Sequence, residues 1–138
     1  MIGQGKTVLV VDAAEAMRQT LGDALRGLRF ERVVPVGTVE DARLALASGR
    51  TDLALIDWQL GEQSGFDLAA DIRTGRILPR RDLPIIMMSW RAEPRSVLAV
   101  QGLKLNGLLI KPVARDALER KIASALAPAP KPSLERVS

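Results

Sequence analysis

Four short apolar segments of the chain each end on a polar residue. These segments cover residues 8–11, 53–56, 85–88 and 108–110. Each is a continuous apolar run bounded by polar residues, which is typical of a strand buried in a parallel sheet. A fifth run, at residues 33–36, also has the composition of a short strand. The pattern therefore predicts five strands.

Between these runs the apolar residues recur at helical spacing. Thr38, followed by Asp41, predicts a capped start for the second helix, and Pro94 suits the first turn of the fourth. Gly75 and Pro79 close the third βα segment. The apolar positions of the five predicted helices are, in chain order, Met17, Leu21, Leu25 and Leu28; Val39, Ala42 and Leu46; Phe66, Ala69, Ala70 and Ile72; Val97, Leu98 and Val100; and Ala114, Leu118, Ile122, Ala125 and Leu126.

Strands that alternate with helices of this size predict an α/β fold. Right-handed crossovers place helices on both faces of a parallel sheet, so we expect a doubly wound (βα)5 domain. In such a sheet ligands bind beyond the carboxyl ends of the strands. The polar residues that follow the four apolar runs should therefore meet in one crevice: Asp12, Asp57, Ser89 and Lys111.

Length and composition narrow the chemistry of that crevice. The chain has 138 residues, enough for a single domain with a sizeable core. It has no cysteine and no histidine, which excludes disulfides, thiolate metal sites and imidazole catalysis. The chemistry of the crevice must therefore come from carboxylates, hydroxyls and amines.

The ends and the partners follow from the same composition. We expect a domain at residues 1–127 and a flexible Pro-rich tail at residues 128–138. No apolar stretch is long enough to span a membrane, so we expect a cytoplasmic protein without a membrane partner. The net charge is +4, but with two Trp, two Phe and no Tyr there is little stacking surface for nucleic acid.

The spaced motifs of the chain resemble the receiver domain of two-component response regulators. The resemblance rests on Val-Leu-Val-Val-Asp at 8–12, Met-Arg at 17–18, Leu-Ile-Asp-Trp at 55–58 with Gly65, Met-Met-Ser at 87–89, and Lys-Pro at 111–112. It covers residues of about 6 to 126. It implies a flavodoxin-like sheet with strand order 2-1-3-4-5, and in this family the Lys-Pro peptide is commonly cis.

The resemblance also implies a phosphorelay. Asp57 is the candidate phosphoacceptor, because a carboxylate at a strand end can hold an aspartyl phosphate. The implied donor is a phosphohistidine on a sensor histidine kinase or a histidine phosphotransferase. The implied cofactor is Mg²⁺, bound by Asp12, Asp57 and the backbone carbonyl of Gln59. The second acid typical of the family is replaced by Ala13, which weakens the expected metal site.

The other two crevice residues complete the implied switch. Lys111 is expected to contact the phosphoryl group, and Ser89 to follow one of its oxygens as the switch hydroxyl. The predicted protein is a stand-alone signalling module, not an enzyme. Its output is binding of a downstream protein on the surface of the fourth helix, fifth strand and fifth helix, or formation of a homodimer.

Alternatives stay open at this point. Ala13 and the large Trp90 favour a pseudo-receiver, an interaction module without phosphate control. A haloacid-dehalogenase-type phosphatase would also use Asp57 as a nucleophile, but it needs a second aspartate where Gln59 stands. A flavodoxin would need hydroxyls or glycines after the first strand, where the chain has Ala-Ala-Glu-Ala at 13–16.

An arginine group lies near the end of the third predicted helix, at the sheet edge opposite Asp57. Its members are Arg73, Arg76, Arg80 and Arg81. We interpret it as a solvated face. The alternative is a site for an acidic protein surface or a nucleotide.

Overall fold

A computed structural model describes residues 2–77 and 80–128 of the chain. The elements, in chain order, are β1 (Thr7–Val11), α1 (Glu15–Gly27), β2 (Arg32–Val36), α2 (Val39–Ala47), β3 (Leu53–Asp57), β4 (Gln59–Leu60), β5 (Gln63–Ser64), α3 (Gly65–Arg73), β6 (Ile85–Ser89), α4 (Pro94–Gly102), β7 (Gly107–Ile110) and α5 (Arg115–Leu126). Pro79 and almost all of the predicted tail, residues 129–138, lie outside the described residues.

The five main strands form one parallel sheet in the order β2-β1-β3-β6-β7. This confirms the predicted order, with β6 and β7 as its fourth and fifth strands. Every residue of the central strand β3 is buried, whereas the edge strand β2 is half exposed. Pro35 lies in that edge strand, where the missing N–H of proline costs the sheet least.

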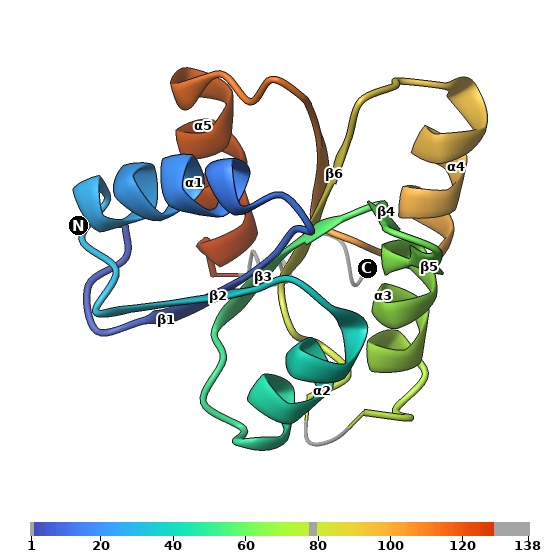
Figure 1. Cartoon of the computed structure of the whole chain (residues 1–138), viewed down its shortest axis with the longest axis horizontal. Helices are drawn as coiled ribbons and strands as arrows, with labels where there is room; N and C mark the ends of the chain where they lie inside the picture. Colours follow the sequence, from blue (N-terminus) through green and yellow to red (C-terminus); the bar gives the residue numbers. More distant parts are fainter. Residues whose placement is uncertain (1, 78–79, 129–138) are drawn as a thin grey trace, which may run out of the picture.

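Helices cover both faces of the sheet (Figure 1). α1 and α5 pack on one face through a cluster that includes Leu25 and Ile122. α2, α3 and α4 cover the other through a cluster that includes Leu46, Ile72 and Val100. These residues belong to the predicted helical patterns, so the doubly wound arrangement is confirmed. No helix within residues 2–77 and 80–128 is long and apolar enough to cross a membrane.

Helix starts follow from local hydrogen bonds. The Thr38 side chain accepts a 3.1 Å hydrogen bond from the Asp41 N–H, which confirms the predicted cap of α2. Pro94 lies in the first turn of α4, also as predicted. The Ser64 side chain caps α3 in the same way as Thr38 caps α2, through the Asp67 N–H at 3.1 Å.

A small antiparallel hairpin, β4 and β5, follows β3 directly and was not predicted from the sequence. Each of its strands has two residues, which is too short for an alternating pattern to be visible. Gly61, with φ of +62°, lies in the connecting turn, where a positive φ favours glycine. The Gln63 side chain donates a 3.2 Å hydrogen bond to Glu40 and so fastens the hairpin to α2.

Candidate functional site

Three of the four predicted residues meet at the carboxyl edge of the sheet. Lys111 donates from Nζ to Oδ2 of Asp12 at 2.5 Å and to Oδ2 of Asp57 at 3.0 Å. The three residues are buried, with 5%, 1% and 7% of their surfaces exposed, respectively. They come from the ends of β7, β1 and β3, which lie far apart in the sequence. The predicted convergence therefore holds for these residues.

The cluster of Asp12, Asp57 and Lys111 combines two carboxylates with one ammonium group. Burial raises the pKa of Asp57 above its ordinary value, and the hydrogen bond from Lys111 offsets only part of this effect. Burial would lower the pKa of Lys111, but its hydrogen bonds to Asp12 and Asp57 outweigh burial and raise that pKa. The site can therefore take up a proton or a cation.

Local contacts position both aspartates. The Asp12 side chain accepts a 2.9 Å hydrogen bond from the Ala14 N–H, and Arg18 donates to the Asp12 carbonyl at 2.7 Å. On the other strand, Gly65 begins α3 directly against the Asp57 backbone. A Cβ at position 65 would overlap the carbonyl oxygen of Asp57, so only glycine allows this approach.

Ser89, the fourth predicted residue, reaches the same edge without joining the cluster. It is the last residue of β6, and its carbonyl accepts a 2.8 Å hydrogen bond from the Lys111 N–H. Its hydroxyl accepts from the Arg91 N–H at 3.2 Å. The Lys111–Pro112 peptide is cis, as the resemblance implied.

Of the residues predicted to hold a metal, Gln59 would contribute its backbone carbonyl. Gln59 pairs with Ser64 in the β4–β5 ladder, and the adjacent Gly65 N–H donates to the Trp58 carbonyl at 2.8 Å. Because bonded and non-bonded pairs alternate in an antiparallel ladder, this bond places Gln59 at a non-bonded position. Its carbonyl is therefore left available, as the predicted Mg²⁺ site requires.

The predicted Mg²⁺ site has few carboxylate ligands. Among the described residues, no group of three or more Asp or Glu side chains is close enough to hold a metal ion together. Ala13, which follows Asp12, is exposed and offers no ligand. Asp12, Asp57 and the Gln59 carbonyl fit Mg²⁺, which prefers oxygen ligands and keeps several waters, but they supply only two negative charges.

An open cleft of about 650 Å³ leads to Asp57 from the side of α4. Trp90, next to Ser89, lies at the rim of this cleft, and 65% of its surface is exposed. Its ring centroid lies 5.6 Å from Nζ of Lys111, within cation–π range. The sequence showed that Trp90 is large but not that it contacts Lys111. The cleft is lined by Asp57, Trp58, Gln59, Ser89, Trp90, Arg91, Glu93, Arg95, Ser96 and Ala99.

The interpretation of the arginine group as a solvated face is wrong for Arg73. This residue is half-buried, and burial lowers the pKa of its guanidinium group. It donates to the carbonyls of Arg81, Leu83, Leu103 and Lys104 and to the Asn106 side chain, at 2.7–3.2 Å. Arg73 therefore binds the chain's own backbone at the amino ends of β6 and β7.

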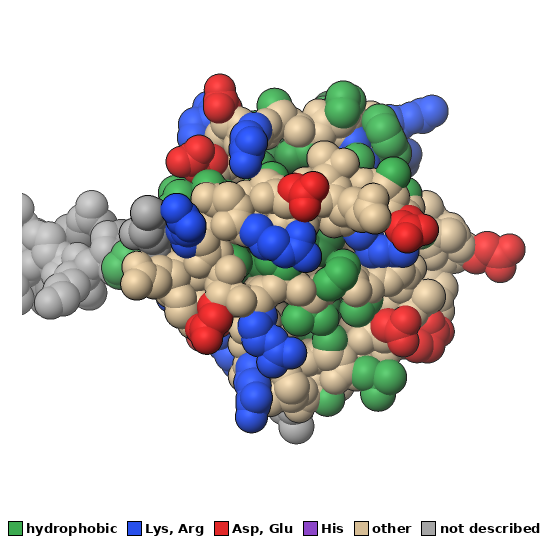
Figure 2. All heavy atoms as spheres, turned by 60° about the vertical axis from the view of Figure 1, so that its left-hand side comes forward, with side chains coloured by type: hydrophobic (Ala, Val, Ile, Leu, Met, Phe, Trp, Pro, Cys, Tyr) green, Lys and Arg blue, Asp and Glu red, His purple; other side chains and the backbone are tan. Residues whose placement is uncertain are grey.

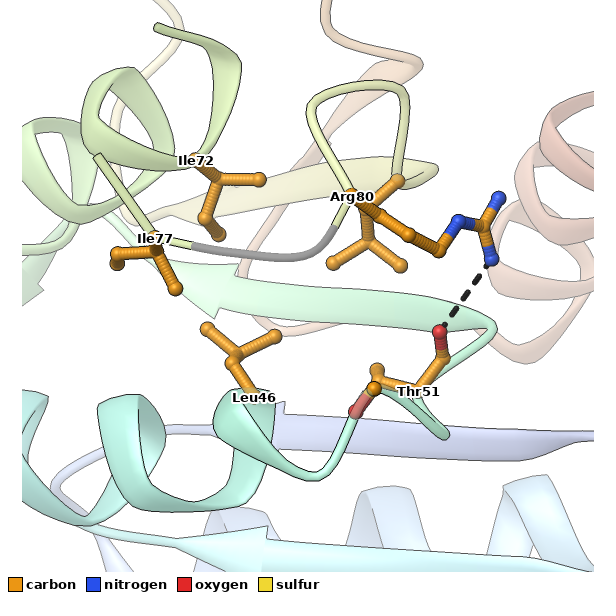
Figure 3. A pocket seen from close by; sticks show the side chains of 7 residues that line it. Leu46, Thr51, Ile72, Ile77 and Arg80 are labelled. Atoms are coloured by element: carbon orange, nitrogen blue, oxygen red, sulfur yellow. Dashed lines mark hydrogen bonds between the residues drawn. The ribbon is translucent and has the colours of Figure 1, made fainter. Parts of the chain in front are cut away.

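Arg80 also contacts the chain itself. It lies at a small apolar cavity between the ends of α2 and α3 and donates to the Thr51 carbonyl at 3.4 Å (Figure 3). Leu46, Ile72 and Ile77 point into this cavity from the other sides. On the face drawn in Figure 2, Lys and Arg side chains are interspersed with Asp and Glu side chains.

The chain is similar in sequence to one protein family and to several individual proteins. Residues 8–123 match the family described as "Response regulator receiver domain". The chain is 25% identical over 122 residues to the chemotaxis protein CheY-3 of Vibrio cholerae, an alignment that covers 88% of this chain and 92% of that protein. It is 27% identical over 120 residues to the chemotaxis protein CheY1 of Helicobacter pylori, covering 86% and 95%.

The similarity extends to three-dimensional structure. The Vibrio cholerae chemotaxis protein CheY4 superimposes on the chain with a TM-score of 0.78 and 21% sequence identity. The superposition covers 88% of this chain and 98% of that one. At this level of identity, the likeness supports the fold alone.

Proposed function

The chain belongs to the response regulator receiver domain family, and on that premise we propose that it accepts a phosphoryl group on Asp57 and thereby switches a protein-binding surface. Receiver domains are signalling modules of two-component and chemotaxis systems. The observation that carries the proposal is the buried cluster at the sheet edge, in which Lys111 lies between Asp12 and Asp57.

The proposed step is a transfer from nitrogen to oxygen. A carboxylate oxygen of Asp57 attacks the phosphorus of a phosphohistidine on a kinase or phosphotransferase. The new P–O bond forms as the P–N bond breaks, and the imidazole nitrogen leaves with the electron pair. The open cleft beside Asp57 gives such a donor its approach.

Lys111 and Ser89 are the proposed sensors of the new charge. The Lys111 ammonium already contacts Asp57, so it lies beside any phosphoryl group carried there. Ser89 lines the same cleft, and its hydroxyl can exchange its bond with Arg91 for one to the phosphoryl group. Phosphorylation would thus bias a pre-existing equilibrium between two conformations.

Mg²⁺ is the proposed cofactor, and its residues would be Asp12, Asp57 and the Gln59 carbonyl. When bound, the ion neutralises charge on the transferring phosphoryl group. The ordinary receiver contribution of a further carboxylate is missing at Ala13. We therefore expect this chain to need more Mg²⁺ than a receiver with two adjacent acids.

The partners follow from the family. We propose a sensor histidine kinase or histidine phosphotransferase as donor, in the cytoplasm, and a downstream protein or a second copy as the bound target. The target surface is that of α4, β7 and α5, where the exposed side chains of Leu98 and Ile110 offer apolar contact. A signalling role of this kind needs no turnover of a substrate.

A labelling experiment tests the acceptor. The purified protein is incubated with Mg²⁺ and phosphoramidate, a small P–N donor, and its mass is measured intact. We expect wild type to gain one phosphoryl group that hydroxylamine removes, and Asp57→Asn to gain none. Asp67→Asn is the matched control, because Asp67 is an exposed aspartate in the first turn of α3. Equal labelling of wild type and Asp57→Asn would rule out Asp57.

The rival function is an interaction module without phosphate control. It is favoured by one observation, the absence of any group of three acidic metal ligands within residues 2–77 and 80–128. In this case neither phosphoramidate nor beryllofluoride with Mg²⁺ would alter the protein, and target binding would be the same for wild type and Asp57→Asn.

A further inference from the structure

Trp90 is exposed to solvent and also contacts a buried charge. Its indole ring is largely exposed to solvent, yet it lies against a lysine whose side chain is 2% exposed. The β6–β7 pairing causes this arrangement. Ser89 and Ile110 are partners in the sheet, so the residues that follow them, Trp90 and Lys111, leave the sheet side by side. The ring thus borders both the solvent and the buried charge cluster.

The ammonium group of Lys111 has three N–H donors. Asp12 and Asp57 accept two of them. The Trp90 ring is the third neighbour of the charged nitrogen. A ring face attracts a cation but repels an anion, because its quadrupole is negative there. Trp90 therefore favours the ammonium group and disfavours an oxyanion at the same place.

The space between Nζ and the ring is too small for a phosphoryl oxygen. A charge-assisted N–H···O bond is about 2.8 Å long. An oxygen bonded to Nζ on the line to the ring would then lie about half of the 5.6 Å separation from the ring centroid. That is closer than the roughly 3.5 Å at which non-bonded heavy atoms make favourable contact. Ring and oxygen cannot share this donor.

We propose that Trp90 is a positioning residue for Lys111: its ring holds the ammonium group in the two-carboxylate arrangement, and it must move away before the N–H that faces it can donate to a phosphoryl oxygen. The inference rests on the proposed function, since it concerns the same site. It makes Trp90 a determinant of how readily the site accepts a phosphoryl group, and it links that acceptance to the exposed surface on which a partner could engage the indole ring.

The first test measures the contact itself and needs no phosphoryl group. In the NMR spectrum, the ring current of Trp90 should shift the ε-methylene protons of Lys111 upfield. Trp90→Leu, which keeps apolar bulk without a ring, should lose that shift. Adding beryllofluoride with Mg²⁺ to wild type should also remove it, as the ring departs. Absence of the shift in the free wild-type protein would overturn the inference.

The second test measures binding of the phosphoryl mimic. Titration calorimetry with beryllofluoride and Mg²⁺ avoids any dependence on indole fluorescence. We expect Trp90→Leu and Trp90→Ala to bind it about three- to tenfold more tightly than wild type, the factor that a cation–π contact of this kind supplies. Trp90→Phe, which keeps a smaller ring, should fall between them and wild type.

A matched control separates a specific effect from a change in the cleft. Trp58 lines the same cleft but stacks on Phe66, with ring centroids 4.8 Å apart. Trp58→Phe should leave the Lys111 shift unchanged. Equal binding by wild type, Trp90→Leu and Trp90→Ala would overturn the inference while leaving the proposed function intact. If no variant binds the mimic, the proposed function fails and the inference fails with it.

Discussion

Two buried or half-buried cations hold opposite ends of the same sheet in different ways. Lys111, at the carboxyl ends of the strands, is surrounded by the carboxylates of Asp12 and Asp57. Arg73, at the amino ends of β6 and β7, is surrounded by four backbone carbonyls and one side-chain amide. Each cation ties together segments that are distant in the sequence, but only one of them has partners that titrate.

This difference separates a reactive site from a structural one. The neutral oxygens around Arg73 satisfy the guanidinium group completely and cannot exchange it for another cation. The carboxylates around Lys111 carry one negative charge more than the lysine neutralises, and burial raises the pKa of Asp57. Of the two ends, therefore, only the Lys111 end has a charge balance that an additional proton, metal ion or phosphoryl group can change.

The largest expected effect comes from removing the cation of the reactive end. Lys111→Met leaves two carboxylates buried without a cationic partner, which should lower the free energy of unfolding by about 3–5 kcal/mol near neutral pH. Without the lysine, Asp57 binds its proton more strongly in the folded state than in the unfolded state. The variant should therefore regain stability as the pH falls toward about 5. Urea unfolding at both pH values measures the change, and a pH-independent loss would contradict it.

Removing the Arg73 cation should lower the free energy of unfolding by less than removing the Lys111 cation does. This loss should not depend on pH. Arg73→Met loses hydrogen bonds to carbonyls that water can partly reach, which we expect to cost about 2–3 kcal/mol. Arg73→Lys keeps the charge but not the planar fork, and should recover less than half of the loss. The same urea series checks both variants. Recovery at low pH, like that of Lys111→Met, would remove the distinction between the two ends.

Restoring the missing acid should strengthen the proposed Mg²⁺ site at the Lys111 end of the sheet. Ala13→Asp adds a carboxylate beside Asp12 and should tighten Mg²⁺ binding about tenfold, equivalent to about 1.4 kcal/mol. Trp58 fluorescence reports the binding when both proteins carry Trp90→Phe, which leaves one indole near the site. Ala14→Asp is the matched control for added charge. Equal tightening by both variants would mean that general attraction, not a ligand at position 13, is responsible.

The smallest effect concerns Asp57, the proposed acceptor. An acid whose pKa is raised on folding binds more protons in the folded state, so it makes the folded state less stable as the pH rises from its ordinary pKa through the raised one. Asp57→Asn removes the titrating group and with it this loss of stability. We expect it to raise stability near pH 7 and to have less effect near pH 4, measured by urea unfolding. A variant that is less stable than wild type near pH 7 would contradict this sign.

Most of the fold could be predicted because each main element carries its own local signal. Continuous apolar runs marked the strands, and residues such as Thr38 and Pro94 marked helix starts. The meeting of Asp12, Asp57 and Lys111 followed from topology, since parallel strands bring their carboxyl ends to one edge. Their roles in phosphate and metal binding remain predictions.

What escaped prediction depends on contacts between distant segments. The hydrogen bonds of Arg73 join α3 to residues 8 to 33 positions further along the chain, and no local pattern announces them. The β4–β5 hairpin is too short to show periodicity. The contact between Trp90 and Lys111 depends on the register of β6 and β7, which composition does not reveal.

The close approach of Gly65 to Asp57 limits how this chain can vary during evolution. Any single-nucleotide change that replaces Gly65 by another residue adds a Cβ against the backbone of Asp57, whereas a Cβ at Gly102 in α4 would meet nothing within 4 Å. Two glycine codons of the same gene thus face unequal selection. A lineage could discard the chemistry of Asp57 and still be unable to change the residue behind it, so an invariant glycine would persist as a relic of the fold rather than as a mark of function.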